Sequence, residues 1–174
     1  MVLTLTDIVT KYNTILNSAD PRGEANEFRR NYCYAIPTPE IIASIAKFID
    51  AKSKTGVLSI YSGAGLWERY IGERITRTDI GIICTDIKPP GSGTKCYYPV
   101  IKLSANAALK KYKHDILFIC MPPDNHIEHL KLTSTYVIYV APRGSPMPSG
   151  YSDLAIIELN GFPGESITMH ILKN

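Results

Sequence analysis

Three short segments carry residues that could together bind a nucleoside. The first is the turn Gly63-Ala64-Gly65, where missing side chains allow a sharp backbone turn and the close approach of a ligand. The second is Asp86, about 20 residues after Gly65, a spacing at which an acid accepts hydrogen bonds from ribose hydroxyls. The third is the run Met121-Pro122-Pro123-Asp124-Asn125. Each segment alone could be a plain loop, but the three in this order predict one ligand site.

Buried strands in the sequence would place these segments side by side. Residues 57–61 form a short run of apolar and β-favouring residues directly before the glycine turn, and similar runs follow along the chain. Near-continuous apolar runs are typical of parallel strands covered on both faces, and ligands bind beyond the carboxyl ends of such strands. The turn residues at 160–164 predict a hairpin at the end of the chain. The predicted strands cover residues 57–61, 80–85, 97–103, 115–121, 136–141, 154–159 and 166–172.

Amphipathic helices are predicted before and between these strands. Their apolar residues recur at three- and four-residue spacing over 1–17, 38–50, 66–75, 105–112 and 125–132. In contrast, Asp20-Pro21-Arg22-Gly23 predicts a break, followed by an irregular stretch to residue 37. We expect one α/β domain over 1–174, with a helical segment at 1–50 and a sheet core at 56–174. The expected architecture is a three-layer sandwich around a seven-stranded, mostly parallel Rossmann-like sheet that ends in an antiparallel hairpin.

Two predicted connections are too short for the helix that usually joins parallel strands. Residues 88–97 and 142–152 are rich in Pro and Gly. Either one flanking strand pairs differently, or these segments are loops near the mouth of the site that act as lids or bind substrate. Exposed loops without a role in binding fit the sequence equally well.

Composition and charge exclude several classes of function. The 174 residues are 45% hydrophobic and 20% charged, and 19 basic against 16 acidic residues give a net charge of +3, so the chain is neither disordered nor a polycation. Nucleic-acid binding therefore has only weak support. No apolar run is long enough to cross a membrane, and we expect a cytoplasmic protein with four reduced cysteines. The spacing of Cys and His predicts no metal site.

The glycine turn, the following acid and the proline pair resemble those of class I S-adenosylmethionine-dependent methyltransferases, and the resemblance covers nearly the whole chain. Gly63 and Gly65 match two glycines of the family's D/E-x-G-x-G-x-G turn, and Met121-Pro122-Pro123 falls where amino-methyltransferases have D/N/S-P-P-Y/F/W. The resemblance implies strand order 3-2-1-4-5-7-6 and S-adenosylmethionine as cofactor. It implies that Asp86 binds the ribose and that Ser104 lies near the adenine. The implied cofactor residues are Tyr61, Gly63, Gly65, Asp86, Ile87, Ser104, Met121 and Pro122.

The sequence also departs from that family at several positions. Tyr61 stands where the family has the acid that engages the cofactor's amino group, and Trp67 replaces the third glycine. Met121 lacks an acceptor for an exocyclic amine, and Asp124 replaces the aromatic residue that would stack on a flipped base, so base N-methylation is disfavoured. Residues 34–40, which begin with Tyr34, resemble the segment that precedes the cofactor turn in some adenine methyltransferases. There this segment covers the methionine end of the cofactor. The candidate acceptor-site residues are Tyr34, Asp124, Asn125 and His126, of which His126 could act as a base.

Two other functions remain open on the sequence. The missing acid and the short connections fit a non-catalytic binding or assembly module of the same fold that has lost the cofactor. A nicotinamide-dependent oxidoreductase shares the turn and the acid, but Glu68 occupies the place of the last glycine of G-x-G-x-x-G. The implied partners are an unidentified methyl acceptor and, as a further possibility, a protein that completes the site; a membrane is not expected.

Overall fold

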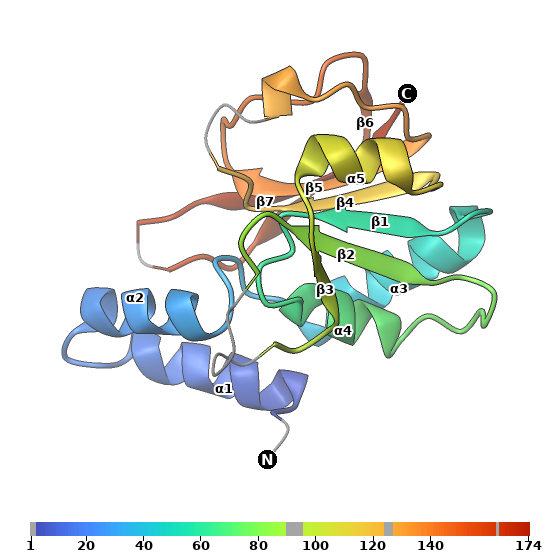
Figure 1. Ribbon diagram of the computed structural model, residues 1–174. Coiled ribbons are helices and arrows are strands. Elements are labelled where there is room, and N and C mark those ends of the chain that lie inside the picture. Colours follow the sequence, from blue (N-terminus) through green and yellow to red (C-terminus); the bar gives the residue numbers. More distant parts are fainter. Residues whose placement is uncertain (1–2, 90–95, 124–126, 163) are drawn as a thin grey trace.

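A seven-stranded sheet forms the centre of the protein in the computed structural model, which describes residues 3–89, 96–123, 127–162 and 164–174 (Figure 1). The strand order is β3-β2-β1-β4-β5-β7-β6. β7 runs antiparallel to β5 and β6, and the other neighbouring pairs are parallel. The order and the terminal hairpin confirm the predicted sheet. The strands are β1 (Val57–Ile60), β2 (Ile82–Asp86), β3 (Val100–Lys102), β4 (Ile116–Cys120), β5 (Tyr136–Pro142), β6 (Ser152–Leu159) and β7 (Ile167–Lys173).

Helices cover both faces of the sheet and complete the three layers (Figure 1). Val57 and Phe118 point to the face that packs on α1 to α4, whereas Leu58 and Leu117 point to the face that packs on α5 and the 3₁₀ turn η1. This alternation follows from the two-residue period of a strand, and both faces are apolar because both are covered. The helices are α1 (Leu5–Leu16), α2 (Pro21–Asn31), α3 (Pro39–Lys52), α4 (Leu66–Gly72), α5 (Ala105–Lys111) and η1 (Ile127–His129).

The prediction of an irregular stretch over 20–37 is wrong, because a regular helix, α2, occupies residues 21–31. The Asp20 side chain accepts a hydrogen bond from the Gly23 N–H at 3.0 Å, and Pro21 occupies the first helical turn. An N-cap acid followed by proline starts a helix as readily as it ends one. Phe28 on α2 is buried in the core below the sheet. The end of α2 thereby lies beside the cavity described below, which Arg29 and Arg30 line.

The two short connections contain no helix among their described residues, yet they do not alter the strand order. The nine residues from 143 to 151 join β5 to β6 across the intervening β7. The loop must run back along β5, about 23 Å, and sideways by about 10 Å over two strand spacings. Nine extended residues reach about 30 Å, so the loop just suffices without a helix. The alternative that a flanking strand pairs differently is therefore wrong.

The helix predicted over 125–132 is also wrong in its described part, where only the short turn η1 forms. Residues 125 and 126 of that prediction lie outside the described residues. No helix in the described part of the chain is both long and apolar enough to cross a membrane.

Candidate functional site

A cavity of about 790 Å³ opens where β1, β2 and β4 end, at the edge of the sheet predicted to bind a ligand. Six of the eight predicted cofactor residues line it, whereas Gly65 and Pro122 do not. Tyr34 lines it as well, and the other acceptor-site candidates, Asp124, Asn125 and His126, lie outside the described residues. The six are Tyr61, Gly63, Asp86, Ile87, Ser104 and Met121.

Two neighbouring strands end in strained residues at this cavity. Tyr61 directly follows β1 with φ 59°, and Met121 directly follows β4 with φ 50°. They are the only non-glycine residues with positive φ in the described part of the chain. Such a conformation costs about 1–3 kcal/mol per residue and is found mostly at binding and active sites. At both residues this conformation turns the backbone sharply at the cavity.

Asp86 and the glycine turn are joined by a hydrogen bond across the cavity floor. Asp86 Oδ2 accepts from the Gly63 N–H at 2.9 Å, and its Oδ1 accepts from the Lys88 N–H at 2.7 Å. Each carboxylate oxygen can accept a second hydrogen bond, so the group can still receive two hydroxyls. Gly63 has φ 52°, and a Cβ there would meet nothing within 4 Å. The turn therefore faces open space into which a ligand backbone or sugar could fit.

Gly65 serves the structure of the turn rather than the wall of the cavity. It has φ 73° and is buried, and a Cβ at this position would lie 2.8 Å from the Cβ of Tyr98. The Tyr97 N–H donates to the Ala64 carbonyl oxygen at 2.8 Å, which fixes the segment before β3 against the turn. Any side chain at Gly65 would push that segment away.

The ends of β2 and β3 form an apolar side of the cavity. Ile87 is 65% exposed and faces it together with Leu103 and Ala105, while Ser104 caps α5 by accepting from the Ala107 N–H at 3.4 Å. Leu130 completes this wall. A flat apolar ligand ring would find dispersion contacts here and a few polar atoms at the rim.

Glu68 is the functional candidate that the sequence reading missed. Its side chain lines the cavity although the residue is only 2% exposed, and its Oε1 accepts from Ser59 Oγ at 2.5 Å. Ser62 Oγ in turn donates to Ser59 Oγ at 2.9 Å, which links this acid to the glycine turn. Burial raises the pKa of Glu68, and the charge of Asp86 raises it further. The only signal in the sequence is an acid in a mostly apolar helix, after Leu66 and Trp67 and before Tyr70 and Ile71.

The start of the chain closes another wall of the cavity. Trp67 Nε1, on α4, donates to the Ala35 carbonyl oxygen at 3.0 Å, and both residues are buried. This bond holds the segment that carries Tyr34, which is 54% exposed at the mouth. Arg29 is paired with Glu165, whereas no ion pair of Arg30, which also lines the wall, occurs among the described residues.

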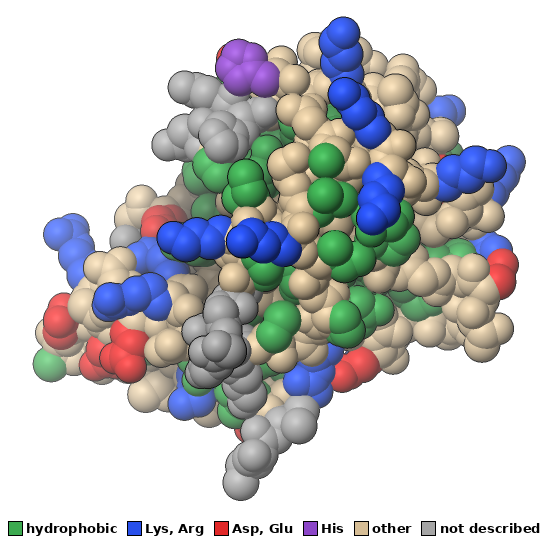
Figure 2. All heavy atoms as spheres, in the orientation of Figure 1, with side chains coloured by type: hydrophobic (Ala, Val, Ile, Leu, Met, Phe, Trp, Pro, Cys, Tyr) green, Lys and Arg blue, Asp and Glu red, His purple; other side chains and the backbone are tan. Residues whose placement is uncertain are grey.

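Charge on the surrounding surface is mixed. Figure 2 shows Lys and Arg side chains scattered over the face drawn, with hydrophobic and uncharged side chains between them and acidic ones mainly over α1 and α2. A continuous basic track of the kind that follows a phosphate backbone is not seen on this face. In the described part of the chain no group of three or more His, Cys, Asp or Glu residues could hold a metal ion.

A second cavity, of about 380 Å³, adjoins the first. The two share Tyr34, Met121 and Pro123 as wall residues, and Pro122, which the larger cavity lacks, lines the smaller one. None of its described lining residues carries a charge. The remaining wall consists of Ile127, Tyr139, Ala141, Pro142, Ser145 and Pro146.

No known protein-family pattern and no curated protein sequence matches this chain. Solved structures do match its fold. TrmN from Thermus thermophilus has a TM-score of 0.55 at 13% identity, covering 87% of this chain and 53% of that one. An O-methyltransferase from Bacillus cereus, in complex with SAH, has a TM-score of 0.53 at 11% identity over 95% and 91% of the two chains. A putative methyltransferase, yhhF from Escherichia coli, has a TM-score of 0.51 at 11% identity over 79% and 85%.

These likenesses show the fold that the resemblance implied. This chain has the class I methyltransferase fold, with the strand order and the antiparallel β7 expected of it. It spans about half the length of TrmN, so further parts of that protein have no counterpart here.

Proposed function

We propose that this chain is an S-adenosylmethionine-dependent methyltransferase and that the larger cavity binds the cofactor. The observation that carries the proposal is the pairing of Asp86 with Gly63 at the neighbouring ends of β1 and β2. A carboxylate with free acceptor capacity then lies beside a turn with open space above it. The fold of the chain and the volume of the cavity are both consistent with this use.

The residues present fit such a cofactor in three places. Asp86 would accept hydrogen bonds from the two ribose hydroxyls. The apolar wall at Ile87 and Leu103 would pack on the adenine, and the Ser104 hydroxyl lies at its rim. The turn at Gly63 would lie against the methionine part, where a side chain would take up the space. The bound cofactor supplies an electrophilic methyl group on a sulfonium.

The smaller cavity is our proposed site for the methyl acceptor. It shares Tyr34 and Met121 with the larger cavity, so an acceptor seated there would lie next to the cofactor's methionine end. The described residues of its wall carry no charge, which favours an uncharged acceptor group. Alignment and desolvation supply much of the rate of methyl transfer without a protein nucleophile. Tyr34, Asp124, Asn125 and His126 remain the candidates for contact with the acceptor.

Calorimetric titration tests the proposal directly. Purified protein would be titrated with S-adenosylmethionine and S-adenosylhomocysteine, and with NAD as a control for a nicotinamide site. We expect micromolar binding of the first two ligands and none of NAD. Absence of binding by either methyl-cofactor ligand at millimolar concentration would overturn the proposal and leave a non-catalytic module of the same fold.

A further inference from the structure

The proposed cofactor carries a positive α-ammonium group, and the cavity must offer it an acceptor. Tyr61, at the end of β1, is uncharged. Among the described residues that line the larger cavity, the carboxylates are Asp86 and Glu68. Asp86 already accepts from the Gly63 and Lys88 N–H groups, and its spare capacity suits ribose hydroxyls. An ammonium moved from water into the cavity without an anion would lose much of its solvation energy.

Glu68 is linked to the glycine turn through two serine hydroxyls. It belongs to α4, and its carboxyl is held by Ser59 Oγ at 2.5 Å, which in turn accepts from Ser62 Oγ on the turn at 2.9 Å. The side chain is almost fully buried from water and yet reaches the cavity wall. Its carboxyl is therefore fixed at the cavity, and no Lys or Arg among the described residues forms an ion pair with it.

The groups that face Glu68 favour its neutral form. Burial raises the pKa of the Glu68 carboxyl, and the negative charge of Asp86 raises it further, whereas the hydroxyls of Ser59 and Ser62 oppose this in part. The neighbouring thiols of Cys33, Cys84 and Cys120 are neutral, because desolvation raises their pKa values too. The titratable groups that face Glu68 in the described structure are Asp86 and Cys84 of β2, Cys120 of β4, Cys33 before α3 and Tyr98 before β3.

We propose that Glu68 receives the α-ammonium of the cofactor, in place of an acid at Tyr61, and releases its proton to solvent as the cofactor binds. The inference rests on the proposed function. One neutral carboxylic acid becomes a carboxylate paired with one ammonium, and one proton leaves. In a site shielded from water this pair is stronger than on a surface, which offsets the cost of ionising a buried acid.

A pair of ligands and a pair of variants test this. S-adenosylhomocysteine carries the ammonium, and 5′-methylthioadenosine keeps the nucleoside but lacks the amino-acid part. Glu68→Gln keeps the shape and the contact to Ser59 but cannot ionise. We expect at least a tenfold loss of S-adenosylhomocysteine affinity in this variant and an unchanged affinity for 5′-methylthioadenosine. Asp86→Asn is the matched control, because it should weaken both ligands, which share the ribose.

Proton release gives a second readout that a purely structural role would not move. Calorimetry in two buffers of different ionisation enthalpy counts the protons exchanged. The titration is done at about pH 6.5, below the pKa of about 8 of an α-amino group, so that the ligand carries its ammonium. The natural protein should release protons on binding S-adenosylhomocysteine and none on binding 5′-methylthioadenosine. Glu68→Gln should release none with either ligand.

Each failure has its own signature. If Glu68→Gln weakens both ligands equally, or weakens neither, the residue holds the turn or plays no part, and the inference is overturned while the proposed function stands. If neither ligand binds the folded natural protein, the proposed function itself fails, and the role of Glu68 fails with it.

Discussion

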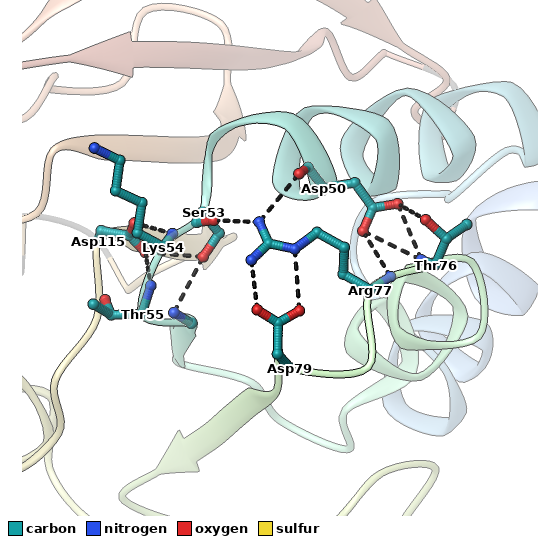
Figure 3. Close-up of polar contacts among 9 residues, drawn as sticks. Asp50, Ser53, Lys54, Thr55, Thr76, Arg77, Asp79 and Asp115 are labelled. Atoms are coloured by element: carbon teal, nitrogen blue, oxygen red, sulfur yellow. Dashed lines mark hydrogen bonds and ion pairs between the residues drawn. The ribbon is translucent and has the colours of Figure 1, made fainter.

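The two ends of the sheet use polar side chains in opposite ways. At the amino ends of β1, β2 and β4, Arg77 donates two hydrogen bonds to Asp79 and one to the Ser53 carbonyl oxygen at 2.7 Å (Figure 3). Asp115 accepts from Ser53 Oγ at 2.9 Å and from the backbone N–H groups of residues 54 and 55. Polar groups here bind one another and tie the starts of three strands together.

At the carboxyl ends the corresponding groups face a cavity. Asp86 keeps acceptor capacity beyond its two backbone partners, and Glu68 is buried beside the cavity with no ion pair to a described Lys or Arg. Tyr61 and Met121 hold strained backbone conformations there. We infer that the amino end of the sheet stabilises the fold. The carboxyl end gives up some stability and leaves polar groups available to bind a ligand. Substitutions at the two ends should therefore change different measurements.

The largest effect is expected at the amino end, from Asp115→Ala. Loss of this acceptor removes three hydrogen bonds to a charged group, one of them from the hydroxyl of the buried Ser53, and we expect a loss of about 3 kcal/mol in the free energy of unfolding. Chemical denaturation would measure it. The affinity for S-adenosylhomocysteine should not change, because Asp115 precedes β4, at the opposite end from the cavity.

The pH dependence of unfolding in acid gives a second test of Asp115. Although burial opposes ionisation, hydrogen bonds from the Lys54 N–H and the Ser53 hydroxyl lower the pKa of Asp115 below its ordinary value. Its stabilisation is therefore present above about pH 4 and is lost as pH falls through the lowered pKa. Asp115→Ala should flatten that part of the acid unfolding curve. An unfolding free energy equal to that of the natural protein would contradict a structural role for this end of the sheet.

Asp86→Ala should mainly lower cofactor affinity, whereas Asp115→Ala should mainly lower stability. We expect cofactor affinity to fall by about 2 kcal/mol, the scale of hydrogen bonds to a charged acceptor. The unfolding free energy should fall by less than it does in Asp115→Ala, since the Gly63 N–H that loses its partner lies at the cavity and can bind water. Titration and denaturation of both variants give a two-by-two comparison. Equal losses of affinity in the two variants would show that the ends of the sheet are not divided in this way.

Much of the fold could be predicted because its signals are local. Near-continuous apolar runs mark the strands of a parallel sheet, and Thr38 before Pro39 marks the start of α3, where the Thr38 side chain accepts from the Ile41 N–H. The same local chemistry at Asp20-Pro21 predicts a break on the sequence alone, although it starts α2. Capping and breaking use the same residue types, and burial of Phe28 decides between them.

The site was predictable in part for a similar reason. Gly63 and Asp86 follow adjacent parallel strands, so topology alone brings them together. The roles of Gly65 and Glu68 depend on contacts with distant segments. Gly65 is required by the approach of Tyr98, and the environment of Glu68 depends on its burial and on residues of β1, β2 and the segment before β3. Neither desolvation nor close packing across the fold can be read from spacing.

Glu68 should make the stability of the ligand-free protein depend on pH. Burial raises the pKa of Glu68 in the folded state, so between the ordinary value of about 4.3 and the raised value the unfolded chain binds fewer protons. The free energy of unfolding should therefore decrease as pH rises through this window, by about 1.4 kcal/mol for each unit of pKa difference.

Glu68→Gln supplies the control, because glutamine does not titrate. Denaturation curves of the two proteins should converge toward pH 4, and the variant should become the more stable of the two as pH rises to 8. Parallel curves over this range would mean that Glu68 ionises as readily in the folded protein as in the unfolded chain.

The smallest effect tests the strain at the carboxyl end. At Tyr61, with φ 59°, glycine adopts the observed backbone without a steric cost, so Tyr61→Gly should be about 1 kcal/mol more stable than Tyr61→Ala. On the exposed surface of α3, Lys47→Gly should instead be about 1 kcal/mol less stable than Lys47→Ala. Thermal unfolding of these four variants measures both differences. The strain fixes the floor of the cavity before a ligand arrives, so Tyr61→Gly should also bind S-adenosylhomocysteine more weakly than Tyr61→Ala. If alanine is the more stable residue at both positions, the turn after β1 holds no strain and the carboxyl end gives up no stability for binding.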